Sequence, residues 1–269
     1  MPHHPYTDSD DFLLMAHRGA SMAAPANTWP AFDMAIKMGA NVIETDVHWT
    51  KDGVLVVCHD DVVDNVSNGR GQIAAMTYRE LQRLDFGYRF TPDGGRTYPF
   101  RGRGIRIPTF NELLGQFPGI RINVDLKPKE PRVGSFLRII EEHGAFDRVV
   151  LASFHHATLV EARSRCKRVA TSASTWEVVQ FLLRLSELRT AFTKWEVPYV
   201  ALQVPNKVWG HTLVNRNFVK RAHELGADVH VWTVNDAKVM SALLDVGVDG
   251  IITDCPDVLQ QTLSHHGHG

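Results

Sequence analysis

Acidic and imidazole side chains end short apolar runs within the first 60 residues of the chain. Glu44 and Asp46 lie near the end of the run 42–47, and His17 and His59 close two other runs. Side chains two residues apart on a strand point the same way, so both carboxylates should face one point. Carboxylate oxygens bind hard divalent cations, and an imidazole, with a reference pKa of about 6.5, exchanges protons near neutral pH. The set predicts a cation site beside acid–base groups.

A short turn connects the run that carries Glu44 and Asp46 to the run before His59. Residues 51–53 separate the two runs, whereas a parallel crossover needs roughly a dozen residues or more. The second run should therefore fold back antiparallel as a hairpin. Reflection about the turn places His59 opposite the stretch from Glu44 to Asp46, beside the same cation.

A third run, 120–126, alternates apolar and polar residues. Its apolar positions should pack against outer helices, which leaves Asn123, Asp125 and Lys127 on the inner face. In a β/α barrel, active sites are built at the C-terminal ends of the strands, which is where these polar residues lie. We therefore add Asp125 to the cation ligands Glu44 and Asp46, and assign Lys127 to a rim that holds an anion.

These residue types suit a substrate whose reacting centre is negative and rich in oxygen, and a phosphodiester is the clearest case. Its hydrolysis needs neutralised charge, a positioned nucleophile and a protonated leaving oxygen. A cation held by the three carboxylates would supply the first, with help from Arg18 and Lys127. His17 and His59 would act as base and acid on opposite sides of phosphorus. The alternative is a charge network without metal, in which the acids pair with Arg18 and Lys127.

The composition and net charge of the chain limit the kinds of partner that it can bind. Its 269 residues are 44% hydrophobic and carry a formal net charge of −1, which argues against nucleic acid or an anionic membrane surface held by bulk charge. We expect a small-molecule substrate. No apolar run approaches the roughly 20 residues of a membrane span, and nothing resembles a signal peptide. We therefore expect no stable membrane insertion and a cytoplasmic location, and find no indication of the oligomeric state.

Short β-branched runs alternate with helical segments, which is the pattern of repeated βα units around a parallel sheet. Between the strands we expect helices at 28–38, 110–117, 175–192 and 237–246. The expected strands lie near residues 12–17, 42–48, 120–126, 148–153, 168–171, 199–204, 229–234 and 250–253. Eight such strands predict an α/β fold, a single (β/α)8 TIM barrel over residues 1–269.

One segment, at about 49–108, does not belong to this repeat and forms a small insertion after the second strand. It begins with the hairpin, continues with a short helix at 78–84, and ends in an irregular loop, 87–108. An irregular segment this long is more often functional than filler, and it should lie above the barrel mouth. Its arginines either touch an anionic ligand or are solvated; they are Arg89, Arg96, Arg101, Arg103 and Arg106.

Several short motifs are spread in order over nearly the whole chain. They are His17-Arg18-Gly19-Ala20, Pro25-x-Asn27-Thr28 with Ala31-Phe32, Gly39-Ala40, Ile43-Glu44-x-Asp46-Val47, Thr50-Lys51-Asp52-Gly53, His59-Asp60, Leu126-Lys127-Pro128, Ser153-Phe154, Trp232-Thr233-Val234-Asn235 and the run from Gly247 to Asp254. In this combination the chain resembles the glycerophosphodiester phosphodiesterases.

The resemblance implies a barrel with a small insertion, one Mg²⁺ or Ca²⁺ ion, and the pair His17 and His59 as acid and base. It also implies that the glycerol hydroxyl of the substrate attacks phosphorus and that water then opens a cyclic phosphate. The products would be sn-glycerol 3-phosphate and an alcohol. The tryptophan that the family has at the position of Trp232 lines the pocket, and Gln203 on the sixth strand is a further candidate for binding substrate.

Three positions depart from the family pattern. Ala26 stands where the family usually has glutamate, Asp125 replaces a glutamate, and Asn65 begins a stretch that replaces an Arg-Thr-Thr motif. Asp125 keeps the charge but shortens the reach by one methylene. The other two changes bear on the identity of the substrate more than on the reaction type.

Two other functions compete with hydrolysis of glycerophosphodiesters. A lysophospholipase D would use the same barrel and metal on a lysophospholipid, and an apolar groove near the insertion would favour it. Aromatic residues available for such a groove are Phe86, Phe90, Tyr98 and Phe100. A non-catalytic barrel would bind a phosphodiester without cleaving it, although retention of both histidines and all three acids argues against that.

Overall fold

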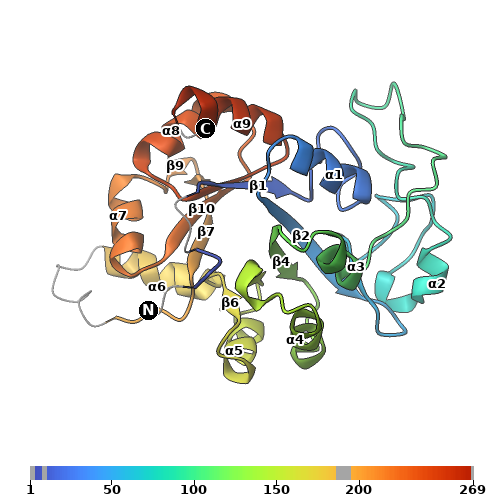
Figure 1. Ribbon diagram of the computed structural model, residues 1–269, viewed down its shortest axis with the longest axis horizontal. Helices are drawn as coiled ribbons and strands as arrows, with labels where there is room; N and C mark the ends of the chain where they lie inside the picture. Colours follow the sequence, from blue (N-terminus) through green and yellow to red (C-terminus); the bar gives the residue numbers. More distant parts are fainter. Residues whose placement is uncertain (1–3, 8–10, 186–194, 268–269) are drawn as a thin grey trace.

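Eight parallel strands form a barrel in the computed structural model, which describes residues 4–7, 11–185 and 195–267 (Figure 1). The strands, in the order in which they pair, are β6 (Ala170–Thr171), β5 (Val149–Ala152), β4 (Arg121–Leu126), β2 (Val42–Trp49), β1 (Leu13–His17), β11 (Gly250–Thr253), β10 (Asp228–Trp232) and β7 (Ala201–Pro205). An isolated parallel bridge between Ser172 and Ala201 joins the two ends of this sheet. The predicted TIM barrel is confirmed.

Helices surround the barrel, and the four that the sequence predicted begin within one residue of the expected position. Thr109 and Glu112 form a capping box at the start of α3, and Asp236 caps α8, which ends at Gly247 in the left-handed conformation. The outer helices are α1 (Trp29–Lys37), α3 (Phe110–Gln116), α4 (Val133–Glu142), α5 (His156–Arg165), α6 (Thr175–Leu185), α7 (Arg216–Glu224), α8 (Ala237–Val246) and α9 (Pro256–His265). The predicted extension of α6 to residue 192 lies outside the described residues.

The core has an outer layer between strands and helices and an inner layer inside the barrel. Ile122, Val124 and Leu126 of β4 pack in the outer layer with helix residues such as Phe110 and Phe136, whose rings stack at 5.5 Å. This alternation leaves the polar residues of β4 on the inner face, as the period of a strand requires. It is the reason that charged groups gather at the barrel mouth.

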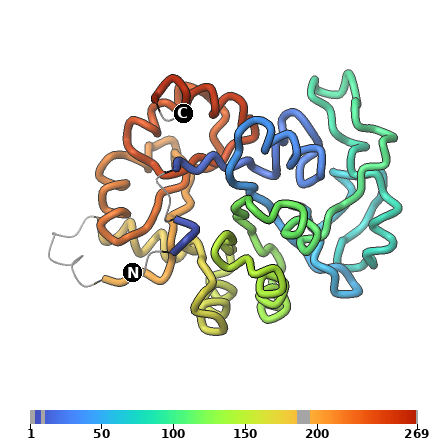
Figure 2. Tube along the Cα trace, in the orientation of Figure 1, coloured from blue at the N-terminus to red at the C-terminus, as the bar shows by residue number. Residues whose placement is uncertain are grey.

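The segment after β2 forms the predicted hairpin and a side lobe. Strand β3 (Leu55–Val57) pairs antiparallel with β2, with Val57 opposite Val47. The insertion then runs along one side of the barrel, cyan to green in Figure 2, and has its own small core around Val63, Ile73 and Phe86. Its short helix, α2 (Tyr78–Leu81), is shorter than the predicted 78–84.

Three of the insertion's arginines donate hydrogen bonds within it. Arg89 donates to the carbonyl of Ser67, Arg106 to that of Leu84, and Arg101 to that of Tyr88. The Arg101 guanidinium also lies 3.5 Å from the centre of the Tyr98 ring. These three side chains therefore hold the lobe together.

A second hairpin follows β7 and was not predicted. Strands β8 (Lys207–Val208) and β9 (His211–Thr212) pair antiparallel around a turn in which both Trp209 and Gly210 have positive φ angles. A pattern of repeated βα units gives no signal for an extra hairpin between β7 and α7. Within the described part of the chain, every helix is too short or too polar to cross a bilayer.

Candidate active site

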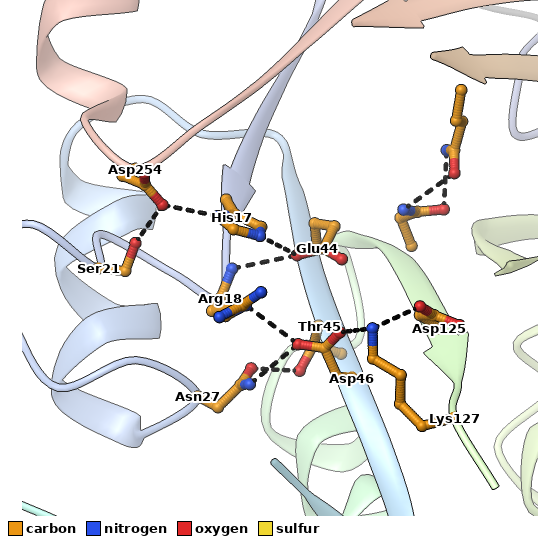
Figure 3. A network of polar contacts seen from close by, with 12 residues as sticks. His17, Arg18, Ser21, Asn27, Glu44, Thr45, Asp46, Asp125, Lys127 and Asp254 are labelled. Atoms are coloured by element: carbon orange, nitrogen blue, oxygen red, sulfur yellow. Dashed lines mark hydrogen bonds and ion pairs between the residues drawn. The ribbon is translucent and has the colours of Figure 1, made fainter. Parts of the chain in front are cut away.

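The predicted acids meet at the mouth because β1, β2 and β4 are neighbours in register. His17 pairs with Glu44, and Asp46 pairs with Asp125. In parallel strands such partners lie side by side at the same height. The backbone amide of Cys58 donates to the carbonyl of Asp46 at 2.9 Å, which brings His59 next to this row. Figure 3 shows His17, Glu44, Asp46 and Asp125 together at this end of the strands.

Asp46 lies at the centre of a network of positive and polar groups. Lys127 Nζ is 2.9 Å from its Oδ1, Arg18 Nε is 3.2 Å from its Oδ2, and Asn27 Nδ2 donates to Oδ2 at 3.2 Å. Burial opposes ionisation of Asp46, but Lys127 and Arg18 outweigh it and lower its pKa. Asp46 is therefore held as a carboxylate.

A glycine allows Arg18 to reach this network. Arg18 and Gly19 both adopt left-handed backbone conformations after β1. A Cβ at Gly19 would lie 2.6 Å from the backbone carbon of Ala31 in α1. The turn can pack against α1 only because residue 19 has no side chain, and that packing directs Arg18 over β2.

Glu44 and Asp125 are less well compensated than Asp46. Burial and the neighbouring Asp46 raise the pKa of Glu44 well above its usual value, against the effect of Arg18. Burial also raises the pKa of Asp125, although Lys127 Nζ lies 2.7 Å from its Oδ2. Its Oδ1 is buried and has no hydrogen-bond partner. Glu44 thus lacks enough positive charge nearby to stabilise it as a carboxylate, and Asp125 keeps one buried oxygen without a partner despite its ion pair with Lys127.

The three carboxylates fit a hard cation in donor chemistry, since Glu44, Asp46 and Asp125 offer only oxygen. The unpartnered Asp125 oxygen and the raised pKa of Glu44 also point to missing positive charge. In the described part of the chain, however, no three His, Cys, Asp or Glu side chains are already grouped as metal ligands. The ammonium of Lys127 lies between Asp46 and Asp125 instead.

The imidazole of His17 is held by a carboxylate that sequence reasoning did not single out. Its Nδ1 lies 2.6 Å from Asp254 Oδ1. Asp254 also accepts hydrogen bonds from Ser21 Oγ at 2.7 Å and Asn235 Nδ2 at 2.6 Å. Burial opposes its ionisation, but these hydrogen bonds, that of His17 foremost, lower its pKa to about 2. His17 Nε2 is left to face the acids, 4.0 Å from Glu44 Oε2.

His59 has a similar partner next to it in the chain. Its Nδ1 lies 2.7 Å from Asp60 Oδ1, and Asn65 Nδ2 donates to Asp60 Oδ2 at 3.0 Å. Burial opposes ionisation of Asp60, but the hydrogen bonds of Asn65 and His59 lower its pKa. Both predicted catalytic histidines thus bind a carboxylate through Nδ1, which orients the ring and leaves Nε2 available. Asn65, a departure from the family pattern, supports this arrangement.

The sequence did contain a signal for these carboxylates. Asp60 and Asp254 both end motifs of the family resemblance, but only the fold shows that Asp254 meets His17, 237 residues away. Of the remaining predicted residues, Trp232 ends β10 and is partly exposed. Gln203 lies inside the barrel, where its amide donates to Asn123 Oδ1 at 3.0 Å and lies 3.2 Å from His230 Nδ1.

An open cavity of about 810 Å³ adjoins the charged groups between β2, β4 and the insertion. It shares His59 and Lys127 with them, and Lys129, Arg132 and His155 also line it. The insertion contributes Asp61 and Asn65. The insertion therefore lines this cavity from one side of the barrel, and the cavity has room for a small polar group next to His59.

The family model described as "Glycerophosphoryl diester phosphodiesterase family" matches residues 17–258. The chain belongs to this family. Because the members of this family hydrolyse phosphoric diesters, the chain is a phosphoric diester hydrolase. A relative in Mycobacterium tuberculosis, named "Probable glycerophosphodiester phosphodiesterase 2", is 34% identical over 262 residues, which are 95% of this chain and 92% of the relative.

Solved structures of the family share the fold. The glycerophosphoryl diester phosphodiesterase domain of an uncharacterised Mycobacterium tuberculosis protein superposes with a TM-score of 0.83 at 22% identity, covering 94% of this chain and 99% of that one. An Oleispira antarctica phosphodiesterase, solved in complex with the product sn-glycerol-3-phosphate, gives a TM-score of 0.73 at 24% identity, covering 93% and 96%. At these identities the likeness supports the barrel itself.

Proposed function

We propose that this enzyme is a metal-dependent glycerophosphodiester phosphodiesterase that releases sn-glycerol 3-phosphate and an alcohol. The observation that carries the proposal is the pair of carboxylate-bound imidazoles, His17 and His59. They lie beside a cluster of buried acids and the positively charged side chains of Arg18 and Lys127. The Oleispira antarctica phosphodiesterase bound to sn-glycerol-3-phosphate supports the choice of product.

The proposed cation ligands are Glu44, Asp46 and Asp125. The unpartnered oxygen of Asp125 and the raised pKa of Glu44 support this assignment, because a cation would bind the free oxygen of Asp125 and stabilise Glu44 as a carboxylate. A bound Mg²⁺ or Ca²⁺ would neutralise charge that develops on the phosphate oxygens. Arg18 and Lys127 would bind the same oxygens and share that task.

His17 and His59 would transfer the protons. One imidazole, through Nε2, takes the proton of the glycerol hydroxyl as its oxygen bonds to phosphorus. The other protonates the departing alcohol oxygen as its bond to phosphorus breaks. Water then adds to phosphorus, opens the cyclic phosphate, and the two imidazoles exchange roles. Asp254 and Asp60 hold each ring with Nδ1 turned away from the substrate.

Trp232 and Gln203 remain predicted substrate contacts. Trp232, at the end of β10, presents its ring at the mouth, where it could cover the glycerol. Gln203 is hydrogen-bonded to Asn123, the residue that pairs with Glu44 across β2 and β4. Gln203 would therefore affect substrate binding through Asn123, on the inner face of β4.

A lysophospholipase D reaction is the second candidate. Three of the four aromatic residues expected to form its groove pack within the insertion instead: Phe86 is buried, and Phe90 meets Phe100 edge to face with ring centres 5.4 Å apart. The fourth, Tyr98, is exposed, with the Arg101 guanidinium over its ring. That support for the reaction is lost.

Turnover of glycerophosphocholine and glycerophosphoethanolamine, with and without divalent ions, tests the proposed function. An enzyme-coupled assay for sn-glycerol 3-phosphate should detect release from both substrates in Mg²⁺ or Ca²⁺. Release of phosphocholine in place of choline would show cleavage of the wrong phosphoester bond. Lack of turnover of every diester would favour the non-catalytic barrel.

A further inference from the structure

The cavity beside His59 carries positive charge that the proposed reaction does not use. It follows the end of β2 and the loop between β4 and α4, where Lys51, Lys129 and Arg132 line it in addition to Lys127. Lys127 is paired with acids of the site, whereas none of the other three forms an ion pair with any residue that the structure describes. All three are exposed to solvent. They are therefore available to a ligand in the cavity.

Arg132 is held at the cavity by its backbone and by two neighbours. It adopts a left-handed conformation, with φ of 48°, directly before α4, which is uncommon for an arginine. Trp49, at the end of β2, donates from Nε1 to the carbonyl of Pro131 at 2.8 Å. The Arg132 guanidinium lies 5.7 Å from the centre of the Trp49 ring, and a Cβ at Gly53 would lie 3.3 Å from its Nη1. The guanidinium is thus placed between the end of β2 and the turn of the hairpin.

The cavity lies on the side of the site where the alcohol leaves. His59 lines it, whereas neither His17 nor Trp232 does. Trp232 ends β10, which lies beyond β11 on the side of β1 that faces away from β2. In the proposed function the ring of Trp232 covers the glycerol. The other substituent of phosphorus then points toward His59 and into the cavity.

The lining of the cavity does not suit a quaternary ammonium group such as that of choline. Such a group binds over the faces of aromatic rings, and Trp49 is the only described Phe, Tyr or Trp in the lining. Trp49 is 7% exposed, and the Arg132 guanidinium already lies over its ring. Two acids, Asp61 and Glu130, also line the cavity. Three unpaired bases with two acids suit a carboxylate that has an ammonium group close to it.

We propose that Arg132 determines the choice of alcohol and favours one that carries a carboxylate, such as the serine of glycerophosphoserine. This inference rests on the proposed function, because it assigns a headgroup to the same reaction. The planar guanidinium donates two parallel hydrogen bonds to the carboxylate oxygens. Lys51 and Lys129 add positive charge, and the two acids suit the ammonium of serine. Water cleaves the bond between phosphorus and the serine oxygen, so the products are sn-glycerol 3-phosphate and serine.

The length of β2 agrees with this assignment. Trp49 follows Asp46 by three residues, which corresponds to about 10 Å along the strand. Arg132 lies against Trp49, so its guanidinium is separated from the acids by a distance of this order. An arginine side chain and a serine whose carboxylate is three bonds from its oxygen span such a distance together. Ethanolamine has no group that Arg132 would bind.

Glycerophosphoserine and glycerophosphoethanolamine differ by one carboxylate, so the ratio of their kcat/KM values measures its recognition. We expect a ratio of about five or more in the wild type, because a charged hydrogen bond at an exposed site gives a modest gain. Arg132→Asn removes the guanidinium, and asparagine tolerates the left-handed backbone. This variant should bring the ratio close to one through the serine diester alone. Arg132→Lys, which keeps the charge but loses the paired hydrogen bonds, should retain part of the preference.

A matched control removes an arginine from the same helix. Arg138 is exposed on α4 and does not line the cavity, so Arg138→Gln should keep the wild-type ratio. A wild-type ratio near one would overturn the role of Arg132, as would a ratio that Arg132→Asn leaves unchanged or a preference for glycerophosphocholine over both diesters. Arg132→Lys repeats the comparison if the asparagine variant does not fold.

Failure of this inference and failure of the proposed function give different results. Turnover of both diesters without any preference would overturn the role of Arg132 and leave the proposed function in place. Calorimetric titration with each diester measures binding without turnover. Tighter binding of glycerophosphoserine that Arg132→Asn abolishes, in an enzyme that cleaves neither diester, would support the role of Arg132 and reject the proposed function. Equal binding in such an inactive enzyme would overturn both.

Discussion

Asp254→Asn tests whether catalysis depends on the orientation of the His17 ring as well as on its presence. The substitution keeps the shape of the side chain but places an amide where Asp254 now accepts three hydrogen bonds, from His17, Ser21 and Asn235. General acid–base catalysis contributes about 100- to 10,000-fold, and loss of a carboxylate behind a histidine costs a large part of that. We therefore expect kcat to fall by about 10- to 1,000-fold, with a smaller effect on KM, and by less than in His17→Ala.

The same change should lower stability by a limited amount. The fall of the Asp254 pKa from 3.8 to about 2 corresponds to about 2.4 kcal/mol at full strength, and to roughly 1 kcal/mol after screening of a side chain that is 25% exposed. Because this pKa is lower in the folded protein, its contribution is complete above the unfolded pKa and is lost as pH falls through the folded pKa. The stability difference between wild type and Asp254→Asn should be constant from about pH 7 to 5 and shrink between about pH 4 and 2.

Three measurements check this reasoning. Steady-state kinetics on glycerophosphocholine give kcat and KM, and urea unfolding gives stability at each pH. The ¹⁵N chemical shifts of the His17 ring show which nitrogen carries the proton, and the variant should lose the single Nδ1–H tautomer. Ser21→Ala, which removes one donor to Asp254, should show a smaller loss in kcat. Wild-type kcat with reduced stability and an unchanged His17 spectrum would mean that Asp254 has only a structural role.

Three further predictions concern the histidines, the metal and its proposed ligand Asp125. His17→Ala and His59→Ala should each abolish turnover while the Tm stays within a few degrees, because both side chains lie at the mouth; substantial activity in either purified variant would remove the acid–base assignment. Exhaustive chelation should inactivate the enzyme, and Mg²⁺ or Ca²⁺ should restore it, whereas full activity after chelation would favour the metal-free charge network. Asp125→Ala should abolish metal-dependent turnover, and Asp125→Glu, which restores the reach of the family's glutamate, should retain part of it. Calorimetric titration with Mg²⁺ shows whether a loss of turnover comes from a loss of metal affinity. An active alanine variant would exclude Asp125 as a ligand.

Strand pattern and connection length predicted much of the fold and of the candidate site. Alternation along β4 placed Asp125 and Lys127 on the inner face, and the short turn at 51–53 fixed the hairpin that brings in His59. Both inferences need only local geometry: the period of two in a strand and the shortness of the connection.

What the sequence did not reveal depends on contacts between distant segments. Asp254 could not be paired with His17 without knowing that β1 and β11 are neighbours in the barrel. The placement of the Lys127 ammonium between Asp46 and Asp125 depends on the rotamer of the lysine side chain, which its position in the chain does not determine. Exposure also escaped prediction, since Phe86 is buried and Phe90 packs on Phe100 in the insertion, while Trp209 projects outward.

The unequal pairing around the barrel has a consequence for how the enzyme can deform. Strands β2 and β4, which carry the acids, share six paired positions, whereas the two ends of the sheet meet through the lone bridge of Ser172 and Ala201. A distortion at that joint disturbs few backbone hydrogen bonds, and one between β2 and β4 disturbs an entire ladder. Trp176 and Trp209 flank the weaker joint. The barrel is thus stiff between the strands that carry the acids, and deforms more easily where β6 meets β7.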